Sequence, residues 1–262
     1  MDARLRCGRQ LRFERLCRSF DGKVAVDINA LDIDSGSITV LLGRSGCGKS
    51  TLLALAGGLI VPDAGTVLHD GVPLAADGDD SADIAIVFQH NNLFPWMSAA
   101  GNIALALRNR GVARATAAAL ARQWLSEVGL QDYADHKPAQ LSGGMRQRVA
   151  LARTLATAPR LFMLDEPFSA LDVQTRRLMQ ANLLKVWEQT RATVLMVTHD
   201  LDEALALADR IVLMGAQPAG HVAQVIDLPQ PRPRNLKDPA LAEIATVLNA
   251  FLESEARQAE HL

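Results

Sequence analysis

The sequence lacks paired cysteines, an excess of either charge and a secretion signal, and each absence excludes a class of protein. Three cysteines among 262 residues do not build the disulfide scaffold typical of secreted domains, so a reducing compartment fits this chain. The formal net charge of −2 provides no broad positive field, and we therefore expect no nucleic-acid partner. With 49% hydrophobic and 21% charged residues, the composition is nevertheless that of a folded globular protein.

Long apolar runs are also missing. Arginines recur through the first 18 residues and leave no stretch of about 7 to 15 apolar residues that could form the core of a signal peptide. The longest uncharged stretch, residues 84–107, contains the polar run 89–92 and Pro95, which a bilayer core would penalise. The sequence therefore predicts a chain without an export signal and without a membrane span.

Short apolar, β-branched runs that end in polar residues predict buried parallel strands, which are joined by crossover helices. These runs cover residues 38–42, 161–164 and 193–197. Helices are expected at residues 50–56, 113–128 and 145–156. The alternation of strands and helices predicts the α/β class, in one large domain or two small ones at roughly 150 residues per domain.

An α/β core, an inserted helical subdomain and a C-terminal segment are expected along the chain. They cover residues 1–89 with 156–228, residues 90–155, and residues 229–262, respectively. Three alternating prolines at the start of the last segment force an extended linker, and residues 241–252 then follow a helical pattern. We interpret the basic residues Arg232, Arg234 and Lys237 of this segment as a solvated face.

A glycine-rich loop follows the first predicted strand and opens a helix, which is the position of a phosphate-binding loop. Residues 43–50 read GRSGCGKS, and the glycines allow backbone N–H groups to turn toward phosphate oxygens at the amino end of the helix. We expect Lys49 on the β- and γ-phosphates and the Ser50 hydroxyl on Mg²⁺. The alternative is a glycine-rich turn with a capping serine.

Two acidic residues follow a second predicted strand. Asp165 and Glu166 come after residues 161–164, at the edge where parallel α/β sheets bind their ligands. Asp165 suits Mg²⁺ coordination, and Glu166 is then free to act as general base on an attacking water. The alternative is an ordinary acidic turn before Pro167.

A second phosphate-type element occurs at residues 141–147, which read LSGGMRQ and open the helix at 145–156. One nucleotide does not need two such elements. The economical explanation is a head-to-tail homodimer, in which this element caps the γ-phosphate held by the partner subunit's Lys49. The capping residues are Ser142, Gly143 and Gly144.

Residues 11–228 resemble the nucleotide-binding subunit of an ATP-binding cassette (ABC) transporter. The resemblance implies a P-loop NTPase core with a mostly parallel sheet, an N-terminal antiparallel β portion and an inserted helical subdomain, with ATP and Mg²⁺ as its ligands. It makes residues 43–51 the Walker A loop, 161–165 the Walker B strand and 141–145 the signature. The Walker A residues assigned to ATP are Gly43, Arg44, Ser45, Gly46, Cys47, Gly48, Lys49, Ser50 and Thr51.

The same resemblance assigns roles to four further residues. Gln89 matches the glutamine loop, which contacts Mg²⁺ and the attacking water, and His199 matches the switch histidine, which contacts the γ-phosphate and orients that water. Asp172 matches the D-loop, which passes information across the dimer. Phe20 falls where the family stacks an aromatic ring on adenine, unless it is a core residue. The expected catalytic residues are Glu166, His199, Gln89 and Lys49, and the expected metal ligands are Ser50, Gln89 and Asp165.

Two positions bear on how the site works. The signature ends in Met145 where most cassettes have glutamine, and we expect ATP hydrolysis to persist because helix-dipole and N–H contacts tolerate sequence change. Cys47 lies inside the phosphate loop, close to Lys49 and a helix N-terminus, both of which lower a thiol pKa. Oxidative or alkylating inactivation is one interpretation of Cys47, and an inert variable position is the other.

Met145, the segment LFPW at residues 93–96 and the short C-terminal segment are similar to importer ATPases of the nitrate, sulfonate and taurine group. This implies two transmembrane permease subunits as partners, a periplasmic or extracellular solute-binding protein, and a peripheral position on the cytoplasmic side of a bacterial membrane. Phe94 and Trp96 lie where the family receives the coupling helix of the permease, unless they pack internally.

Other functions stay open at this point. Importers of a pyrimidine precursor or an aromatic acid would carry the same motifs. Cassettes that act on DNA or ribosomes are a second alternative, but a single Walker A loop only 98 residues before the signature (141 − 43) argues against them. A scaffold that binds ATP without hydrolysing it is a third, and the presence of Glu166 and His199 argues against it.

Overall fold

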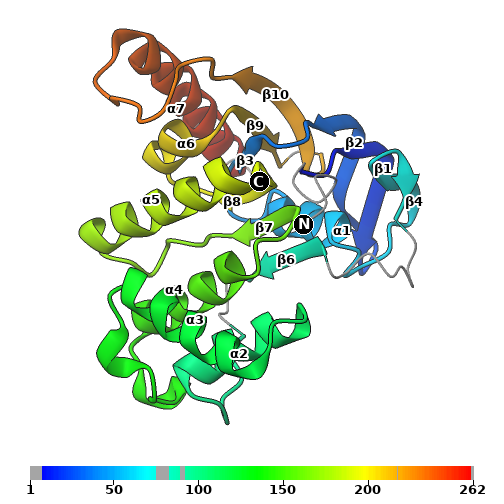
Figure 1. Ribbon diagram of the computed structural model, residues 1–262. Coiled ribbons are helices and arrows are strands. Elements are labelled where there is room, and N and C mark those ends of the chain that lie inside the picture. Colours follow the sequence, from blue (N-terminus) through cyan, green and yellow to red (C-terminus); the bar gives the residue numbers. More distant parts are fainter. Residues whose placement is uncertain (1–7, 75–82, 89–91, 217, 261–262) are drawn as a thin grey trace. The chain divides into compact units, whose positions relative to one another are not determined.

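The computed structural model describes residues 8–74, 83–88, 92–216 and 218–260 (Figure 1). The chain divides into two compact units. Unit 1 comprises the described residues from Asp83 to Ala192, and unit 2 comprises residues 8–74 together with the described residues from Thr193 onward. Among these residues, none of the helices combines the length and the hydropathy that crossing a bilayer requires. The division into a core, a helical subdomain and a C-terminal segment stays a prediction.

Unit 2 contains an antiparallel sheet with the strand order β2-β1-β4-β5. Its strands are β1 (Leu11–Phe20), β2 (Lys23–Ile33), β4 (Ala64–His69) and β5 (Val72–Pro73). Leu11 and Phe13 alternate with exposed residues along β1 and are fully buried, as expected for a strand with one face on the core. Asp21 and Gly22 have φ values of 50° and 77° and form the tight turn between β1 and β2. The predicted N-terminal antiparallel β portion is confirmed.

A second group of strands in unit 2 has the order β10-β9-β3-β8. These strands are β3 (Ile38–Leu42), β8 (Thr193–Thr198), β9 (Arg210–Gly215) and β10 (His221–Asp227). β3 pairs parallel with β8 and with β9, whereas β10 pairs antiparallel with β9. Every residue of β3 and β8 is buried, which explains why both strands consist of apolar residues and buried threonines. The strands predicted at residues 38–42 and 193–197 are confirmed.

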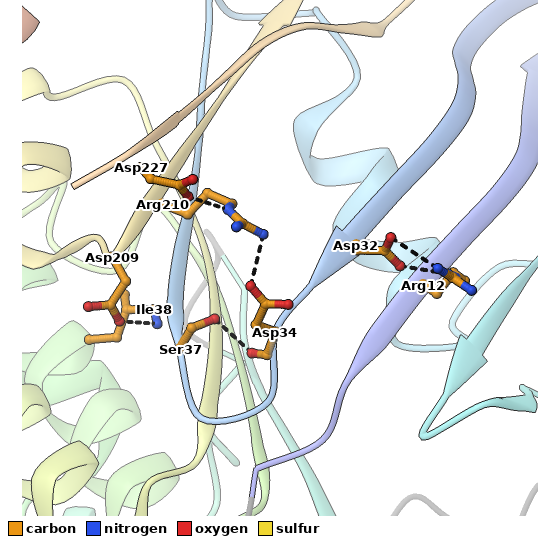
Figure 2. Close-up of polar contacts among 8 residues, drawn as sticks. All are labelled: Arg12, Asp32, Asp34, Ser37, Ile38, Asp209, Arg210 and Asp227. Atoms are coloured by element: carbon orange, nitrogen blue, oxygen red, sulfur yellow. Dashed lines mark hydrogen bonds and ion pairs between the residues drawn. The ribbon is translucent and has the colours of Figure 1, made fainter. Parts of the chain in front are cut away.

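Polar contacts hold the amino-terminal end of β3 (Figure 2). The Ile38 N–H donates to Oδ2 of Asp209 at 2.8 Å. Arg210 reaches toward two carboxylates, that of Asp227 at 2.6 Å and that of Asp34 at 3.0 Å. Exposed ion pairs of this kind contribute only about 0.2–1 kcal/mol each to folding. The Asp209 hydrogen bond fixes the first residue of the strand that leads into the glycine-rich loop.

Three helices belong to unit 2, namely α1 (Lys49–Ala56), α6 (Leu201–Leu207) and α7 (Pro239–Glu260). α7 lies against α6, as Figure 1 shows, and buries Leu241 and Leu248, which are two turns apart on one face. The C-terminal helix predicted at residues 241–252 is confirmed, and it extends further in both directions.

The linker between β10 and α7 corrects one expectation. The Arg234 guanidinium donates to four backbone carbonyl oxygens, those of Leu205, Ala208, Leu228 and Gln230. Arg232 pairs with Asp209. The interpretation of these two arginines as a solvated face is therefore wrong, although Lys237 is exposed. A proline-rich linker has few N–H groups of its own, and the five donors of a guanidinium instead tie it to the end of α6.

Unit 1 combines two parallel strands with four long helices. They are β6 (Ile84–Val87), β7 (Leu161–Asp165), α2 (Ala99–Asn109), α3 (Arg114–Glu127), α4 (Gly143–Ala156) and α5 (Val173–Thr190), with short 3₁₀ turns at Gln131–Tyr133 and Pro138–Gln140. α3 buries Ala117, Ala121 and Leu125 at four-residue spacing and packs against α2 and α4, the neighbouring green helices of Figure 1. The strand predicted at residues 161–164 and the helices predicted at 113–128 and 145–156 are confirmed.

Candidate active site

Two neighbouring strands of unit 2 bring the phosphate loop and His199 to one edge of the sheet. Leu42 of β3 pairs in register with Thr198 of β8. Gly43 and His199 are the next residues along the two strands, so both leave the sheet at its carboxyl edge. This is the edge at which parallel α/β sheets bind ligands, and His199 is exposed there.

The phosphate loop takes its shape from glycine backbone. Gly46 and Gly48 have φ values of 84° and 88°, which residues with a Cβ rarely adopt. A Cβ atom on Gly48 would lie 2.7 Å from the Ala25 carbonyl oxygen, and one on Gly43 would lie 2.5 Å from the Met214 carbonyl oxygen. Gly43 and Gly48 are therefore required by close backbone packing.

Lys49 occupies the inside of the loop. Its side chain is buried, and Nζ donates to the carbonyl oxygens of Gly43 and Arg44, both at 2.7 Å. The sulfur of Cys47 lies 3.7 Å from the same nitrogen. These hydrogen-bonding partners are all neutral. A buried ammonium group with neutral partners favours binding of an anion in the loop.

The amino end of α1 also fits a phosphate group. Gly48 is its N-cap and provides no side-chain hydrogen bond to the first turn, which carries no acidic residue. Four other helices, α2, α4, α5 and α6, are capped by the side chains of Ser98, Ser142, Asp172 and Asp200. N–H groups without a side-chain cap, at the positive end of the helix dipole, suit phosphate oxygens. Ser45, Gly46 and Ser50 are exposed at this end, and Arg44 and Thr51 are half-buried.

The structure bears on the two interpretations of Cys47, a reactive thiol and an inert position. Its side chain is fully buried. Burial raises the pKa of the Cys47 thiol above its ordinary value and outweighs the opposing effect of the Lys49 ammonium group. The lowering influence predicted for Lys49 is therefore present but smaller than the effect of burial, and the structure favours the inert interpretation of Cys47.

Phe20 ends β1 with 44% of its surface exposed, so the alternative interpretation as a core residue is wrong. The Arg18 guanidinium lies 4.9 Å from the centre of the ring, and Arg18 also pairs with Asp63 at 2.6 Å. An exposed ring that is oriented by a cation–π contact on one side can stack on a flat heterocycle.

In unit 1, the candidate carboxylates follow β7. Val87 of β6 pairs in register with Leu164 of β7, so these two parallel strands also end at one edge. Asp165 is the last residue of β7 and is buried, whereas Glu166 is half-buried. Gln89 lies outside the described residues.

Glu166 has a left-handed backbone conformation with a φ of 47°, which costs about 1–3 kcal/mol for a residue with a Cβ. Its carbonyl oxygen accepts three hydrogen bonds, from Gln147 Nε2 at 3.1 Å, from the Ser169 hydroxyl at 3.1 Å and from the Ser169 N–H at 3.3 Å. Strain that the surrounding hydrogen bonds maintain is typical of functional positions. This geometry favours a functional carboxylate at Glu166 over an ordinary acidic turn.

Gln147 is a site residue that the sequence pattern does not single out. It lies on α4 and is 2% exposed. Its amide donates to the Glu166 carbonyl oxygen and accepts from the Ala170 N–H at 3.0 Å, so it links the signature helix to the loop that carries Glu166. The sequence held one indication of this role, a glutamine on the side of the predicted helix that is buried. A buried side-chain amide must find hydrogen-bonding partners.

The signature residues open α4. The Ser142 hydroxyl accepts a hydrogen bond from the Met145 N–H at 3.2 Å and so caps the helix. Ser142 and Gly143 are exposed, and Gly144 lies so close to the Ala170 carbonyl oxygen that a Cβ would be 3.0 Å from it. Met145 contributes a backbone N–H that any residue but proline would supply.

Asp172 is the N-cap of α5. Its carboxylate accepts hydrogen bonds from the N–H groups of Gln174 and Thr175 and from the Thr175 hydroxyl. These bonds, that of the Thr175 hydroxyl first, lower the pKa of the Asp172 carboxyl below its ordinary value of 3.8. The side chain thus has a structural task, and the transfer of information across a dimer stays a prediction.

The segment with Phe94 and Trp96 presents two aromatic rings to solvent. Trp96 is 70% exposed and Phe94 is 36% exposed, and their ring centres are 5.5 Å apart. The alternative that both pack internally is therefore wrong for Trp96. A groove of about 500 Å³ in unit 1 adjoins Phe94 and is lined by apolar residues of β6 and α2 and by Arg110 and Arg153.

Asn102 of α2 forms hydrogen bonds with the backbone of this segment. It is fully buried, its Oδ1 accepts from the Phe94 N–H at 2.7 Å, and its Nδ2 donates to the carbonyl oxygens of Phe94, Met97 and Ser98. One buried amide thus satisfies four backbone groups, and Trp96 is exposed on a segment with a fixed backbone.

Comparison with known sequences supports one family. The ABC transporter family matches residues 26–169, which is more than half of the chain. The nitrate import ATP-binding protein NrtD of Synechococcus elongatus is 43% identical over 235 residues, covering 87% of this chain and 85% of that protein. The taurine import ATP-binding protein TauB of Mesorhizobium japonicum is 45% identical over 219 residues, covering 83% of this chain and 84% of that protein.

Comparison with solved structures supports the same family. The dimeric structure of a post-hydrolysis state of the ATP-binding cassette MJ0796, bound to ADP and Pi, matches with a TM-score of 0.74 and 31% sequence identity. The match covers 84% of this chain and 99% of that one. The P-loop NTPase fold of the ABC type is confirmed. The chain belongs to the ABC transporter family, as one of its ATP-binding proteins, which are ATPases coupled to transport.

Proposed function

We propose that this chain hydrolyses ATP to power an importer of a small anion of the nitrate, sulfonate or taurine type. The observation that carries the proposal is the phosphate loop, in which a buried Lys49 ammonium group has neutral partners and the N-cap residue of α1, Gly48, has no side chain to cap the helix. The relatives that import nitrate and taurine support the anion class.

In the proposed site, residues 43–51 bind the triphosphate of ATP and Phe20 stacks on its adenine. Ser50 and Asp165 offer a hydroxyl and a carboxylate oxygen, the hard donors that Mg²⁺ prefers, and Gln89 is proposed as a third ligand. When bound, Mg²⁺ would neutralise charge on the phosphate oxygens.

Glu166 is proposed as the general base that takes a proton from the attacking water, and His199 as the residue that orients this water toward the γ-phosphate. Lys49 holds the β- and γ-phosphates through the transfer. The strained, triply hydrogen-bonded backbone at Glu166 supports its role, because a base must be held in one position to abstract a proton efficiently.

We further propose that two copies of the chain enclose two nucleotides. Ser142, Gly143 and Gly144 of one subunit would then cap the γ-phosphate held by the partner subunit's Lys49. The exposure of Ser142 and Gly143 and the dimeric state of the similar MJ0796 cassette support this arrangement.

The membrane partners are two permease subunits, and the chain would bind them peripherally on the cytoplasmic side of the membrane. The exposed Trp96 and the groove beside Phe94 support docking of a permease coupling helix there, since aromatic side chains are frequent interface anchors. A solute-binding protein outside the membrane would deliver the anion to the permease.

The test is ATP hydrolysis by the chain assembled with its permease in lipid vesicles. We expect phosphate release to rise when the solute-binding protein is loaded with nitrate, taurine or an alkanesulfonate, and to be absent with Glu166→Gln. Stimulation only by an uncharged pyrimidine precursor or an aromatic acid would reassign the solute. No phosphate release under any condition would contradict the proposed function.

A further inference from the structure

The C-terminal helix α7 ends its buried face with a charged residue. Leu241, Leu248 and Glu255 follow each other at intervals of seven residues and therefore lie on one face of the helix. The two leucines are fully buried, as expected for helix packing. Glu255 is only 9% exposed, although a carboxylate at such a position carries a desolvation cost that an apolar residue would avoid.

The carboxylate of Glu255 has a defined partner. Its Oε2 accepts a hydrogen bond from the Ala216 N–H at 2.8 Å. Ala216 directly follows β9, and the Met214 carbonyl oxygen near the end of β9 is the atom that leaves no space for a Cβ on Gly43. Glu255 therefore anchors α7 to the strand end that touches the first residue of the phosphate loop.

A second contact joins α7 to the phosphate loop itself. The Arg44 guanidinium donates through Nη1 to the carbonyl oxygens of Glu255 at 2.7 Å and Ala256 at 3.3 Å. A cation near the carboxyl end of a helix interacts favourably with the helix dipole. The backbone carbonyl of the same Arg44 accepts a hydrogen bond from Lys49 Nζ. A continuous series of contacts therefore runs from α7 through Arg44 to the ammonium group of Lys49.

We propose that α7 is a positioning element of the nucleotide site, and that Glu255 is a positioning residue that holds the phosphate loop in its ATP-binding shape. The inference rests on the proposed role of residues 43–51 in binding ATP. A loop that binds phosphate through backbone N–H groups has a higher affinity when its shape is fixed before the ligand arrives. The loop then loses no conformational entropy on binding. Loosening α7 should therefore raise the KM for ATP more than it lowers kcat.

The primary test compares three variants of the full chain by steady-state ATP hydrolysis. Glu255→Ala removes the acceptor for the Ala216 N–H and is expected to raise the KM for ATP about 3- to 10-fold, with kcat within about twofold of the wild type. Glu255→Gln keeps an acceptor oxygen but removes the charge, and its KM is expected to stay within about twofold. Glu253→Ala changes an exposed glutamate of the same helix and is expected to leave KM unchanged.

These variants separate positioning from charge and from general stability. If the negative charge of Glu255 acted only by repelling ATP, both Ala and Gln would lower KM, and the proposal would be wrong. A Glu255→Ala chain that melts at a lower temperature but keeps the wild-type KM would likewise contradict it. A wild-type chain that does not bind ATP would instead overturn the proposed function, and the inference with it.

A second measurement does not depend on the folding of Glu255→Ala. Deleting residues 253–262 removes both carbonyl partners of Arg44 but keeps Leu241 and Leu248. Arg44→Met is expected to raise the KM for ATP in the full chain. In the shortened chain the same substitution should raise KM by a smaller factor, because the contact between Arg44 and α7 is already absent there. An equal effect of Arg44→Met in both chains would show that Arg44 acts on ATP independently of α7, and would overturn the proposal.

Discussion

The phosphate loop and the loop that carries Glu166 are built in opposite ways. The first is shaped by glycine backbone, with a lysine that donates to two carbonyl oxygens of its own loop. The second holds a strained glutamate through hydrogen bonds from side chains, those of Gln147 and Ser169. The difference teaches that the first loop depends on positions with no space for a Cβ, Gly43 and Gly48, whereas the second depends on hydrogen bonds from side chains. The variants below test this contrast, from the largest expected effect to the smallest.

The largest effect is expected from Gly48→Ala. The new Cβ would lie 2.7 Å from both the Ala25 carbonyl oxygen and a Val26 methyl group, at a φ of 88°. We expect loss of measurable ATP binding and a fall of more than about 2 kcal/mol in the free energy of unfolding, since overpacking adds to backbone strain. Urea denaturation and binding of a fluorescent ATP analogue would measure both.

Gly46→Ala is the matched control for this variant. Its φ of 84° is equally left-handed, but a Cβ there would meet no described atom within 4 Å. The free energy of unfolding should fall by only about 1–2 kcal/mol, the cost of the backbone conformation. Equal losses in the two variants would show that close packing at Gly48 is unimportant.

Gln147→Ala tests the second loop. It removes one donor to the Glu166 carbonyl oxygen and the acceptor of the Ala170 N–H. We expect kcat to fall about 10- to 100-fold because Glu166 loses its fixed position, while ATP affinity stays unchanged because the phosphate loop is intact. Gln174→Ala, at an exposed glutamine of α5, should change neither quantity. An affinity loss as large as the kcat loss would contradict the separation of the two loops.

Trp96→Ala tests the segment with Phe94 and Trp96, where we propose that a permease coupling helix docks. We expect transport and permease-stimulated hydrolysis to fall about tenfold or more, as for an interface anchor, with the basal ATPase rate of the isolated chain unchanged. Tyr133→Ala removes another exposed aromatic side chain of unit 1 and should affect neither rate. Equal losses in basal hydrolysis and transport would refute the docking role of Trp96.

The smallest effect is expected from Asp172→Asn, because asparagine is also a good helix N-cap but does not titrate. The pKa of Asp172 is lowered in the folded chain, so its ionised form stabilises the fold above the unfolded pKa of 3.8. This contribution is lost as the pH falls through the lower folded pKa. The difference in unfolding temperature between the two chains should therefore be constant near pH 7 and shrink as the pH falls below 3.8. A stability difference that does not depend on pH would contradict this cause.

The sequence predicted the parts of the molecule in which local pattern and structure agree. The strands at residues 38–42 and 193–197 are buried on both faces, so apart from Thr39 and Thr193 their residues are apolar. The glycines at positions 43 and 48 are required by the shape of the loop and are therefore visible as a motif.

What the sequence did not predict depends on contacts between distant residues. Gln147 acts on a residue 19 positions away, and Arg234 binds carbonyl groups up to 29 positions away. For Cys47, the neighbouring Lys49 and helix end correctly predict a lowering influence on the pKa. Burial, which no local pattern reveals, outweighs it and raises the pKa instead.

The central claim is that two copies of this chain enclose ATP between them. The most direct test is the molar mass of purified Glu166→Gln in solution, measured by light scattering with ATP and Mg²⁺ and again without nucleotide. We predict the mass of a dimer with ATP and that of a monomer without it. A chain that binds ATP and keeps the mass of a monomer across micromolar concentrations would contradict the account.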